Sequence, residues 1–417
     1  MRRATKELID LDSVKKATRK MRLSTNSDYY TLWKLLPERP KVDKLIELYL
    51  NSLENLYHML HVPSFKQQYA EFWEQPAEAQ TNSPMIAIIL LIISCVICVD
   101  EAEELKFVGD ESRNRTTAVI SILACEDWIQ SHSQKHLTAQ YFRIKCLLLV
   151  AKTIAGMHIK RWYHEVGSLI RQAMSIGLHL EVEGSKIGKI MSEFDKEMRR
   201  RIWAVICELE ITICLLRGLP SALQGVETSC KAPSLIFDDE ITCPTTGPAA
   251  EHYTRPTYKE STYLVHASRY RSLRLDLVGR VNSPTFDGDL AELLRLEDET
   301  RAAFRQYDLD QPYTKNGTVS TSFARIHFKL EFLRLLLLMN RHAAVLSTSE
   351  STRRWATHRC IDFASQTIGE HMVDVDEQTC TLLTYLHTPS FTAAISLTLD
   401  LAVMIQGTSD LENCYSV

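Results

Sequence analysis

Apolar residues recur at three- and four-residue steps along most of the chain, which is the spacing of a helix that buries one face. Residues 42–57 show this spacing clearly. It predicts further helices over residues 66–73, 85–99, 113–131, 138–155, 159–176, 194–216, 258–278, 287–307, 320–346, 351–367 and 390–406. The alternation of apolar and polar residues that marks a strand is nearly absent. We therefore expect an all-α, multi-helix fold.

The most apolar segment is MIAIILLIISCVICV, residues 85–99. It covers 15 residues between Pro84 and Asp100, whereas a helix needs about 20 to cross a bilayer. Pro84 suits the first helical position, and Asn82 or Ser83 suits the cap before it. The pattern predicts a buried core helix and no membrane contact.

Two polar zones divide the helical pattern. Residues 1–40 form a basic lead-in, and residues 227–255 are the least helical stretch because they are broken by glycine and several prolines. We expect a basic N-terminal tail over 1–40, a helical domain over 41–245, and a C-terminal helical half of the same region over 246–417.

The first 22 residues carry a local charge of +5. The cations that cluster there are Lys15, Lys16, Arg19, Lys20 and Arg22. A short basic cluster is typical of a nuclear import signal, of a weak arm that contacts phosphates, or of a solvated helix face. The sequence leaves these three alternatives open.

Composition excludes several classes of protein. A content of 45% apolar and 24% charged residues is too apolar for a disordered chain. The formal net charge of −4 is not that of an electrostatic binder of nucleic acid. Most of the eleven cysteines lie in apolar helical segments, and the N-terminal arginines are followed by no apolar run that could serve as a secretory signal. A reducing intracellular compartment is expected.

Residues 169–220 carry the most informative helix boundaries. The first helix should stop at Gly177, a residue suited to the left-handed conformation, and Leu178 should dock on the helix that it follows. Ser192 should cap the next helix, in which Glu197 and Arg201 can pair on the surface. Trp203 lies in its apolar stripe, and the Gly-Leu-Pro sequence of residues 218–220 should end it.

This arrangement resembles the middle, regulatory region of fungal zinc-cluster transcription factors. HVPSF (61–65) resembles the opening motif of that region, and FDDEITCP (237–244) resembles its later acidic, proline-ended loop. The family signature falls here on Arg171, Ala173, Gly177, Leu178, His179, Glu197, Arg200, Arg201, Trp203, Gly218 and Pro220. The resemblance covers roughly residues 42–400. Glu210 and Leu219 depart from it, since the family prefers aspartate and arginine at these positions.

The DNA-binding zinc cluster of that family needs six cysteines in two sets, each opening with C-x-x-C. This sequence has no cysteine before Cys95, and its one C-x-x-C, Cys95 to Cys98, lies among isoleucine and valine. A structural zinc site needs four ligands. We expect no zinc and no other cofactor.

No enzyme motif is complete. The loop from Gly184 to Lys189 is too short for a phosphate loop and lacks its Ser or Thr, and His164-Glu165 has no second histidine at the metalloprotease spacing. Asp238-Asp239-Glu240 lacks the third carboxylate of a terpene cyclase. His179 is expected to cap a helix or bond a carbonyl. We expect no catalytic activity and no metal site.

The resemblance implies a nuclear transcriptional regulator, acting as an activator of a fungal specialised or secondary-metabolite gene cluster, with the trichothecene mycotoxin cluster as one example. Its expected partners are other transcription factors or the transcription machinery, so DNA contact would be indirect. A small-molecule effector between helices and homo- or heterodimer formation are also compatible with such a domain.

Two alternatives remain open. The chain could be an effector-binding or dimerising competitor that forms inactive pairs with full-length zinc-cluster regulators. It could also derive from a truncated gene model that lost its DNA-binding exon.

Overall fold

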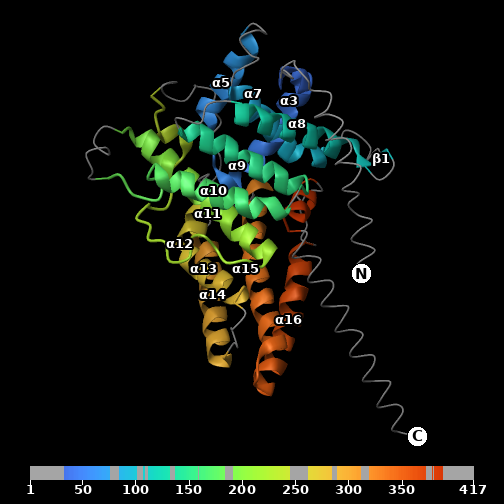
Figure 1. Ribbon diagram of the computed structural model, residues 1–417, viewed down its shortest axis with the longest axis vertical. Helices are drawn as coiled ribbons and strands as arrows, with labels where there is room; N and C mark the ends of the chain where they lie inside the picture. The colour runs from blue at the N-terminus through green and yellow to red at the C-terminus, as the bar shows by residue number, and fades with distance from the viewer. Residues whose placement is uncertain are drawn as a thin grey trace.

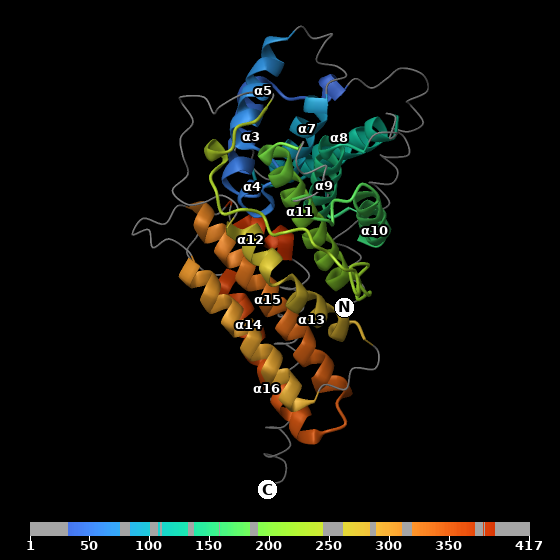
Figure 2. The same ribbon diagram turned by 90° about the vertical axis from the view of Figure 1, so that its left-hand side faces the viewer.

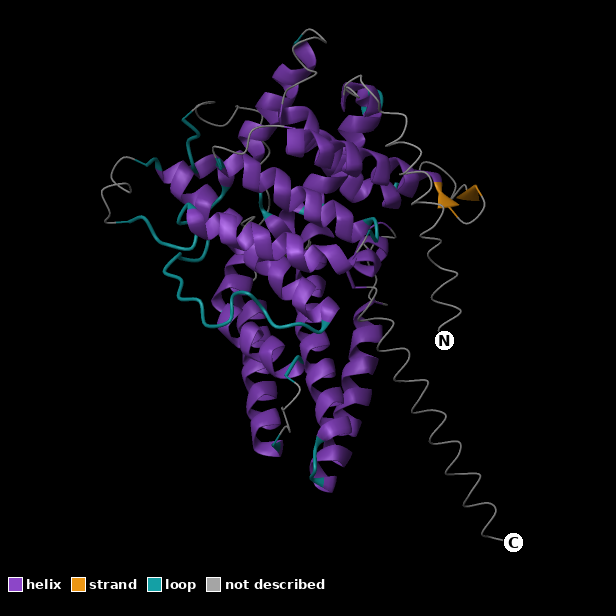
Figure 3. Ribbon diagram, in the orientation of Figure 1, coloured by secondary structure: helices purple, strands orange, loops and turns teal. Residues whose placement is uncertain are grey.

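The computed structural model describes residues 32–75, 84–100, 107–108, 111–131, 137–157, 159–183, 191–244, 262–283, 289–310, 319–371, 378 and 380–387. Most of these residues are helical (Figure 3). Two short strands, β1 (Phe107–Val108) and β2 (Glu111–Ser112), pair antiparallel. The predicted all-α class is confirmed.

The helices of the first half form a compact block (Figure 1). In chain order its elements are η1 (Leu32–Leu35), α3 (Arg39–Asn51), α4 (Glu54–Tyr57), α5 (Val62–Glu74), α7 (Pro84–Val96), η2 (Ile97–Val99), α8 (Arg113–Ser131), α9 (Ala139–Ile154), α10 (Ile159–Ser175), α11 (Glu193–Arg217) and η3 (Asp238–Glu240). Leu32 is buried in this block.

The later helices extend away from that block, as Figure 2 shows for α14, α15 and α16. The elements are α12 (Thr262–Arg269), α13 (Arg271–Val281), α14 (Leu290–Asp310), α15 (Val319–Leu346) and α16 (Glu350–His371). α15 and α16 run antiparallel, since Cys360 lies against the carbonyl of Leu337 while the earlier Lys329 of α15 binds the later Glu370 of α16. α12 and α13 pack on α11, so the first half contacts the second.

The apolar segment forms α7 and η2, and its side chains from Met85 to Val96 are buried. α7 lies against α3, α8 and α9, and it begins at Pro84 as predicted. The cap residues Asn82 and Ser83 lie outside the described residues. Among the described residues, no helix has the length and apolar character needed to span a bilayer. The expected core helix is confirmed.

Two predicted helices are divided. The segment predicted over 42–57 forms α3 and α4, with a turn at residues 52–53. The segment predicted over 258–278 is helical from residue 262, and it consists of α12 and α13 with a break at Tyr270. The backbone of Tyr270 leaves the helical region (φ −98°, ψ 15°) while the apolar spacing continues across it. Periodicity therefore could not reveal the break. The helix predicted over 390–406 lies outside the described residues.

Candidate functional site

Asp238 joins three segments that are far apart in the sequence. Its side chain is fully buried in η3. Oδ1 accepts hydrogen bonds from Nη1 of Arg201 at 2.7 Å and Nε2 of His58 at 3.1 Å, and Oδ2 accepts one from the backbone N–H of Val62 at 2.7 Å. The Asp238 carbonyl also accepts from Nε2 of His61 at 2.8 Å. One aspartate thus ties the HVPSF segment and α11 to the acidic loop.

The pair formed by Glu197 and Arg201 belongs to the same cluster. Nε of Arg201 donates to Oε1 of Glu197 at 3.0 Å, and the Glu197 carboxylate also accepts from the backbone N–H of Ser234. The pairing was predicted from the four-residue spacing, but its predicted place on the surface is wrong: Arg201 is 0% and Glu197 3% exposed. The two side chains are buried because the chain from Ser234 to Asp238 crosses over them. We call Asp238, Arg201, Glu197, His58 and His61 the signature cluster.

Charge stabilises the ionised forms within this cluster. Burial by itself would raise the pKa of the Asp238 carboxyl, but the charges of Arg201 and His58 and their hydrogen bonds hold it well below its usual value. Burial would likewise lower the pKa of Arg201, and its two carboxylate partners raise it instead. A folded-state pKa below the unfolded value means that Asp238 stabilises the fold at neutral pH and loses that contribution in acid.

Glu54 lies beside the signature cluster and behaves differently. Its Oε1 accepts from the backbone N–H of Leu60 at 2.6 Å, and the side chain is 3% exposed. Burial raises the pKa of the Glu54 carboxyl to about 7, although the charge of His58 and the Leu60 hydrogen bond oppose the shift. This carboxyl therefore takes up a proton close to neutral pH.

Replacing Glu54 by glutamine should change the pH dependence of stability. A folded-state pKa raised from 4.5 to about 7 gives a contribution that is complete below pH 4.5 and is lost as the pH rises through 7. The melting temperature of the wild type minus that of Glu54→Gln should therefore decrease as the pH rises from 4.5 through 7. Thermal unfolding followed by circular dichroism measures it, and a pH-independent difference would contradict the assignment.

Arg200 binds two glutamates in the loop that follows α10. Its guanidinium donates to Glu181 at 3.0 Å and to Glu183 at 2.8 Å. Lys231 joins this group through its backbone N–H, which donates to Glu181, and through its ammonium, which pairs with Glu183. Burial would raise the pKa of the Glu181 carboxyl, but Arg200 and the Lys231 N–H lower it to about 2. Arg200 thus fixes the start of the loop between α10 and α11 to α11, and Lys231 joins the same two glutamates from the chain after α11.

The Gly-Leu-His sequence ends α10 as predicted at two of its three positions. Gly177 is left-handed (φ 72°), and Leu178 is buried with its N–H donating to the carbonyl of Ala173. The predicted role of the His179 side chain is not seen: its ring packs against Trp203, with ring centroids 6.0 Å apart. The hydrogen bonds at this residue are made by its backbone carbonyl, which accepts from the N–H groups of Ser229 and Cys230.

The far end of α11 is fixed by Glu210. Its buried Oε1 accepts from the hydroxyl of Ser221 at 3.1 Å and from the N–H of Ala222 at 2.6 Å. Gly218 ends the helix in the left-handed conformation (φ 63°), and the carbonyl of Pro220 accepts from the Tyr163 hydroxyl. The glutamate here, where the resembled family prefers aspartate, holds the turn that Gly218 begins.

A second buried ion pair links α11 to the later helices. Nη1 of Arg274 lies 2.7 Å from both oxygens of Glu208, and the Tyr263 hydroxyl donates to the same carboxylate. These contacts cross the boundary predicted between residues 245 and 246. The boundary itself stays a prediction.

Within the part of the chain that the structure describes, the residues that come nearest to a metal site are His327, Glu331 and His387, which are buried with potential ligand atoms within 4.8 Å of one another. The two imidazoles lie 2.9 Å apart in a hydrogen bond. Arg274 and Arg334 lie within 4 Å of the Glu331 carboxylate. The two arginines already neutralise the charge of the Glu331 carboxylate, which weakens its attraction for a divalent cation. The expectation of no metal stays a prediction.

Other expected residues are dispersed. Arg171 is exposed on α10, and its guanidinium donates to the carbonyl of Gly167. Burial raises the pKa of the Cys98 thiol to about 11 and raises that of Cys95 further, so neither is a ready thiolate ligand. The basic cluster Lys15, Lys16, Arg19, Lys20 and Arg22 and the loop 184–189 lie outside the described residues.

Sequence reasoning missed the role of Asp238, which it placed only in an acidic, proline-ended loop, and that of Glu208, to which it assigned none. A signal for Glu208 was present, because two glutamates at 208 and 210 interrupt an otherwise apolar stretch of α11. Charged residues in such a position are buried only when they are paired. No comparable signal marks Asp238 over Asp239.

Known proteins match a large part of this chain. Residues 46–272 match the model of the fungal specific transcription factor domain. The chain is 25% identical to the transcription factor opdR of Penicillium oxalicum over 78% of its own length and 41% of that protein's. It is 23% identical to the transcription factor lepE of Aspergillus flavus, over 81% of this chain and 39% of the relative.

A third relative carries a pathway in its name. The equisetin cluster transcription factor eqxF of Fusarium heterosporum is 28% identical over 49% of this chain and 30% of the relative. No solved structure matches significantly. The chain spans about two fifths of the length of opdR and lepE. The family match covers more than half of this chain and includes every residue of the signature cluster. The chain therefore belongs to the fungal specific transcription factor domain family.

Proposed function

We propose that this protein activates transcription of a fungal specialised-metabolite gene cluster. The observation that carries the proposal is the family match over residues 46–272, together with relatives that are named as transcription factors of the equisetin and fusarisetin A clusters. The regulatory domain would act in the nucleus by contacting a DNA-bound factor or the transcription machinery. A trichothecene-type pathway remains one candidate among several.

The arrangement of charged groups supports a regulator over an enzyme. The charged residues of α11 that could serve chemistry, including Arg201, Glu208 and Glu210, are buried and bound to other segments. A catalytic acid or base must instead reach a substrate within hydrogen-bond distance. We infer that these groups hold the fold.

A transcriptome comparison between a strain lacking this gene and its parent tests the proposed function. Loss of an activator should lower the transcripts of a set of adjacent genes together. A coordinated rise would support a competitor that forms inactive pairs with full-length regulators, and it would contradict activation. The absence of any coherent change would reject a pathway regulator of either sign.

Nuclear localisation gives a second test. The +5 charge of residues 1–22 motivates the prediction that replacing Lys15, Lys16, Arg19 and Lys20 by alanine moves a fluorescent fusion from the nucleus to the cytoplasm. Replacing the exposed pair Lys66 and Glu47 by alanine provides a control outside the tail. An unchanged nuclear signal in the tail variant would reject the import role and favour a solvated helix face.

A further inference from the structure

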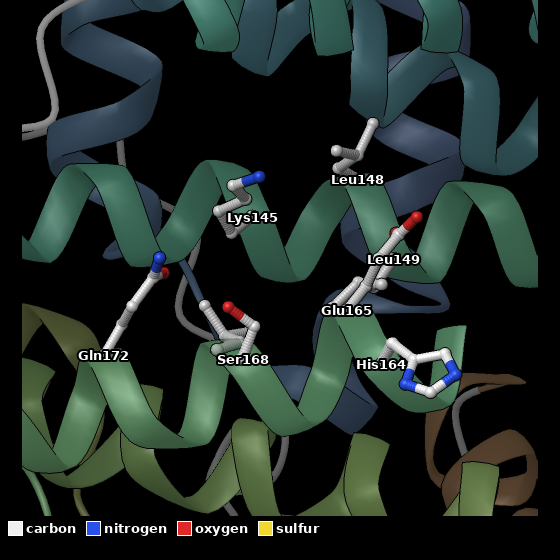
Figure 4. A pocket seen from close by; sticks show the side chains of 8 residues that line it. Lys145, Leu148, Leu149, His164, Glu165, Ser168 and Gln172 are labelled. Atoms are coloured by element: carbon white, nitrogen blue, oxygen red, sulfur yellow. The ribbon is translucent and has the colours of Figure 1, made fainter. Parts of the chain in front are cut away.

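A groove lies between α9 and α10, with a volume of about 240 Å³. Its apolar part is formed by Leu148, Leu149 and Leu169, which are buried beneath it. Polar side chains surround these leucines, and Figure 4 shows Gln172, Ser168 and Glu165 rising from α10 toward α9. The space corresponds to about eight water-sized volumes. An amphipathic molecule with roughly eight non-hydrogen atoms would fill it.

Two acceptor atoms at the groove are already engaged. Oε2 of Glu165 accepts from Nζ of Lys152 at 2.8 Å, and the same ammonium binds Glu126 at 2.9 Å. The Oε1 atom of Gln172 accepts from the Tyr141 hydroxyl at 3.1 Å. Gln172 therefore keeps its amide nitrogen, a donor, to bond a ligand.

Lys145 adds a positive charge on the α9 side of the groove. Its side chain is half-buried, and its ammonium lies 5.9 Å from the centre of the Tyr141 ring. No carboxylate of the described residues comes within 4 Å of it, in contrast to Lys152, which has two. Burial and the charge of Lys152 lower the pKa of Lys145, and the charges of Glu126 and Glu165 oppose that shift only in part. An anionic partner in direct contact would further offset the cost of keeping the Lys145 charge in the groove. Ser168, exposed on α10, supplies a further donor.

We propose that this groove binds a small monocarboxylic acid, with the carboxylate at Lys145, Ser168 and the Gln172 amide and the apolar body on the three leucines. The combination of neutral donors, an apolar floor and a lysine with no carboxylate of the described residues within 4 Å favours a single carboxylate over a cation or a hydrocarbon. The inference goes beyond the proposed regulatory function. Its test is the binding of a carboxylate to the purified chain, and the outcome does not depend on the transcripts of the deletion strain.

Isothermal titration of the full chain with sodium hexanoate tests the proposal, with hexanamide as the neutral analogue. Hexanoate should bind with a Kd of about 1 mM, which is reasonable for eight non-hydrogen atoms. Hexanamide should bind at least about fivefold more weakly because its neutral amide forms no ion pair with the Lys145 ammonium. Equal binding of acid and amide, or no heat of binding up to about 10 mM, would overturn the proposal.

Variants identify the groove as the site. Lys145→Gln should weaken hexanoate binding about tenfold and leave hexanamide binding unchanged, since it removes only the charged contact. Ser168→Ala should weaken hexanoate binding about threefold. Lys66→Gln, on α5 and exposed, is the matched control and should bind like the wild type. Circular dichroism checks that Lys145→Gln is folded, and hexanoate binding to this folded variant with wild-type affinity would place the site elsewhere.

Discussion

Replacing Asp238 by alanine is expected to lower the free energy of unfolding by about 3–5 kcal/mol, the usual cost of removing one partner of a buried ion pair. The substitution removes the acceptor for Arg201, His58 and the N–H of Val62 at once. Arg201 would keep Glu197 as a partner, but its Nη1 would remain buried without an acceptor. Urea denaturation of the purified chain measures the loss.

Two variants accompany this measurement. Asp238→Asn keeps one acceptor oxygen and should cost less than the alanine variant. Glu193→Ala removes a carboxylate that is 78% exposed and pairs with Lys196, and it should change stability by less than about 1 kcal/mol. If Asp238→Ala is no less stable than Glu193→Ala, the signature cluster does not hold the three segments together.

Replacing Trp203 by alanine should destabilise the fold by a similar amount, about 3–5 kcal/mol. The indole is 1% exposed and lies in the main core, beside the His179 ring. Its removal would leave a cavity where α11 meets the end of α10. The midpoint of urea denaturation should fall with little change in slope, because the extent of surface exposed on unfolding stays nearly the same.

An exposed apolar residue of the same region supplies the comparison. Leu180 follows His179 and is 48% exposed, so Leu180→Ala should lie within about 0.5 kcal/mol of the wild type. A Trp203→Ala variant with an unchanged denaturation midpoint would show that the indole is not a core residue. Trp203→Phe, which keeps most of the apolar volume, should fall between the wild type and the alanine variant.

The fold class and most helix ends could be predicted from the sequence because they depend on local signals. Ser192 caps α11 by accepting from the N–H of Asp195, and Gly177 and Gly218 end α10 and α11 in the left-handed conformation. Each of these events involves residues a few positions apart. Capping and glycine rules therefore apply without knowledge of the tertiary structure.

The signature cluster could not be predicted because its contacts span large sequence separations. Asp238 lies 37 residues from Arg201 and 180 from His58. Helical spacing correctly paired Glu197 with Arg201, but it cannot tell a solvated face from one that a distant loop covers. The same limit applies to Glu208, whose partner Arg274 lies 66 residues away.

These contacts also give the family signature a physical meaning. Arg200 fixes the loop that follows α10, Arg201 fixes the later acidic loop, and Trp203 fills the core between them. Three side chains within four positions of α11 thus organise segments on different sides of the helix. The signature residues of α11 that resemble the family are therefore those that join this helix to the neighbouring segments.

A double-mutant cycle between Arg201 and Asp238 tests this account most directly. Urea denaturation would compare the wild type, Arg201→Met, Asp238→Ala and the double variant. We predict that the double variant costs at least about 2 kcal/mol less than the sum of the single variants, because each single change leaves the other charge buried without its partner. Additivity within about 0.5 kcal/mol would contradict the claim that this pair holds α11 to the acidic loop.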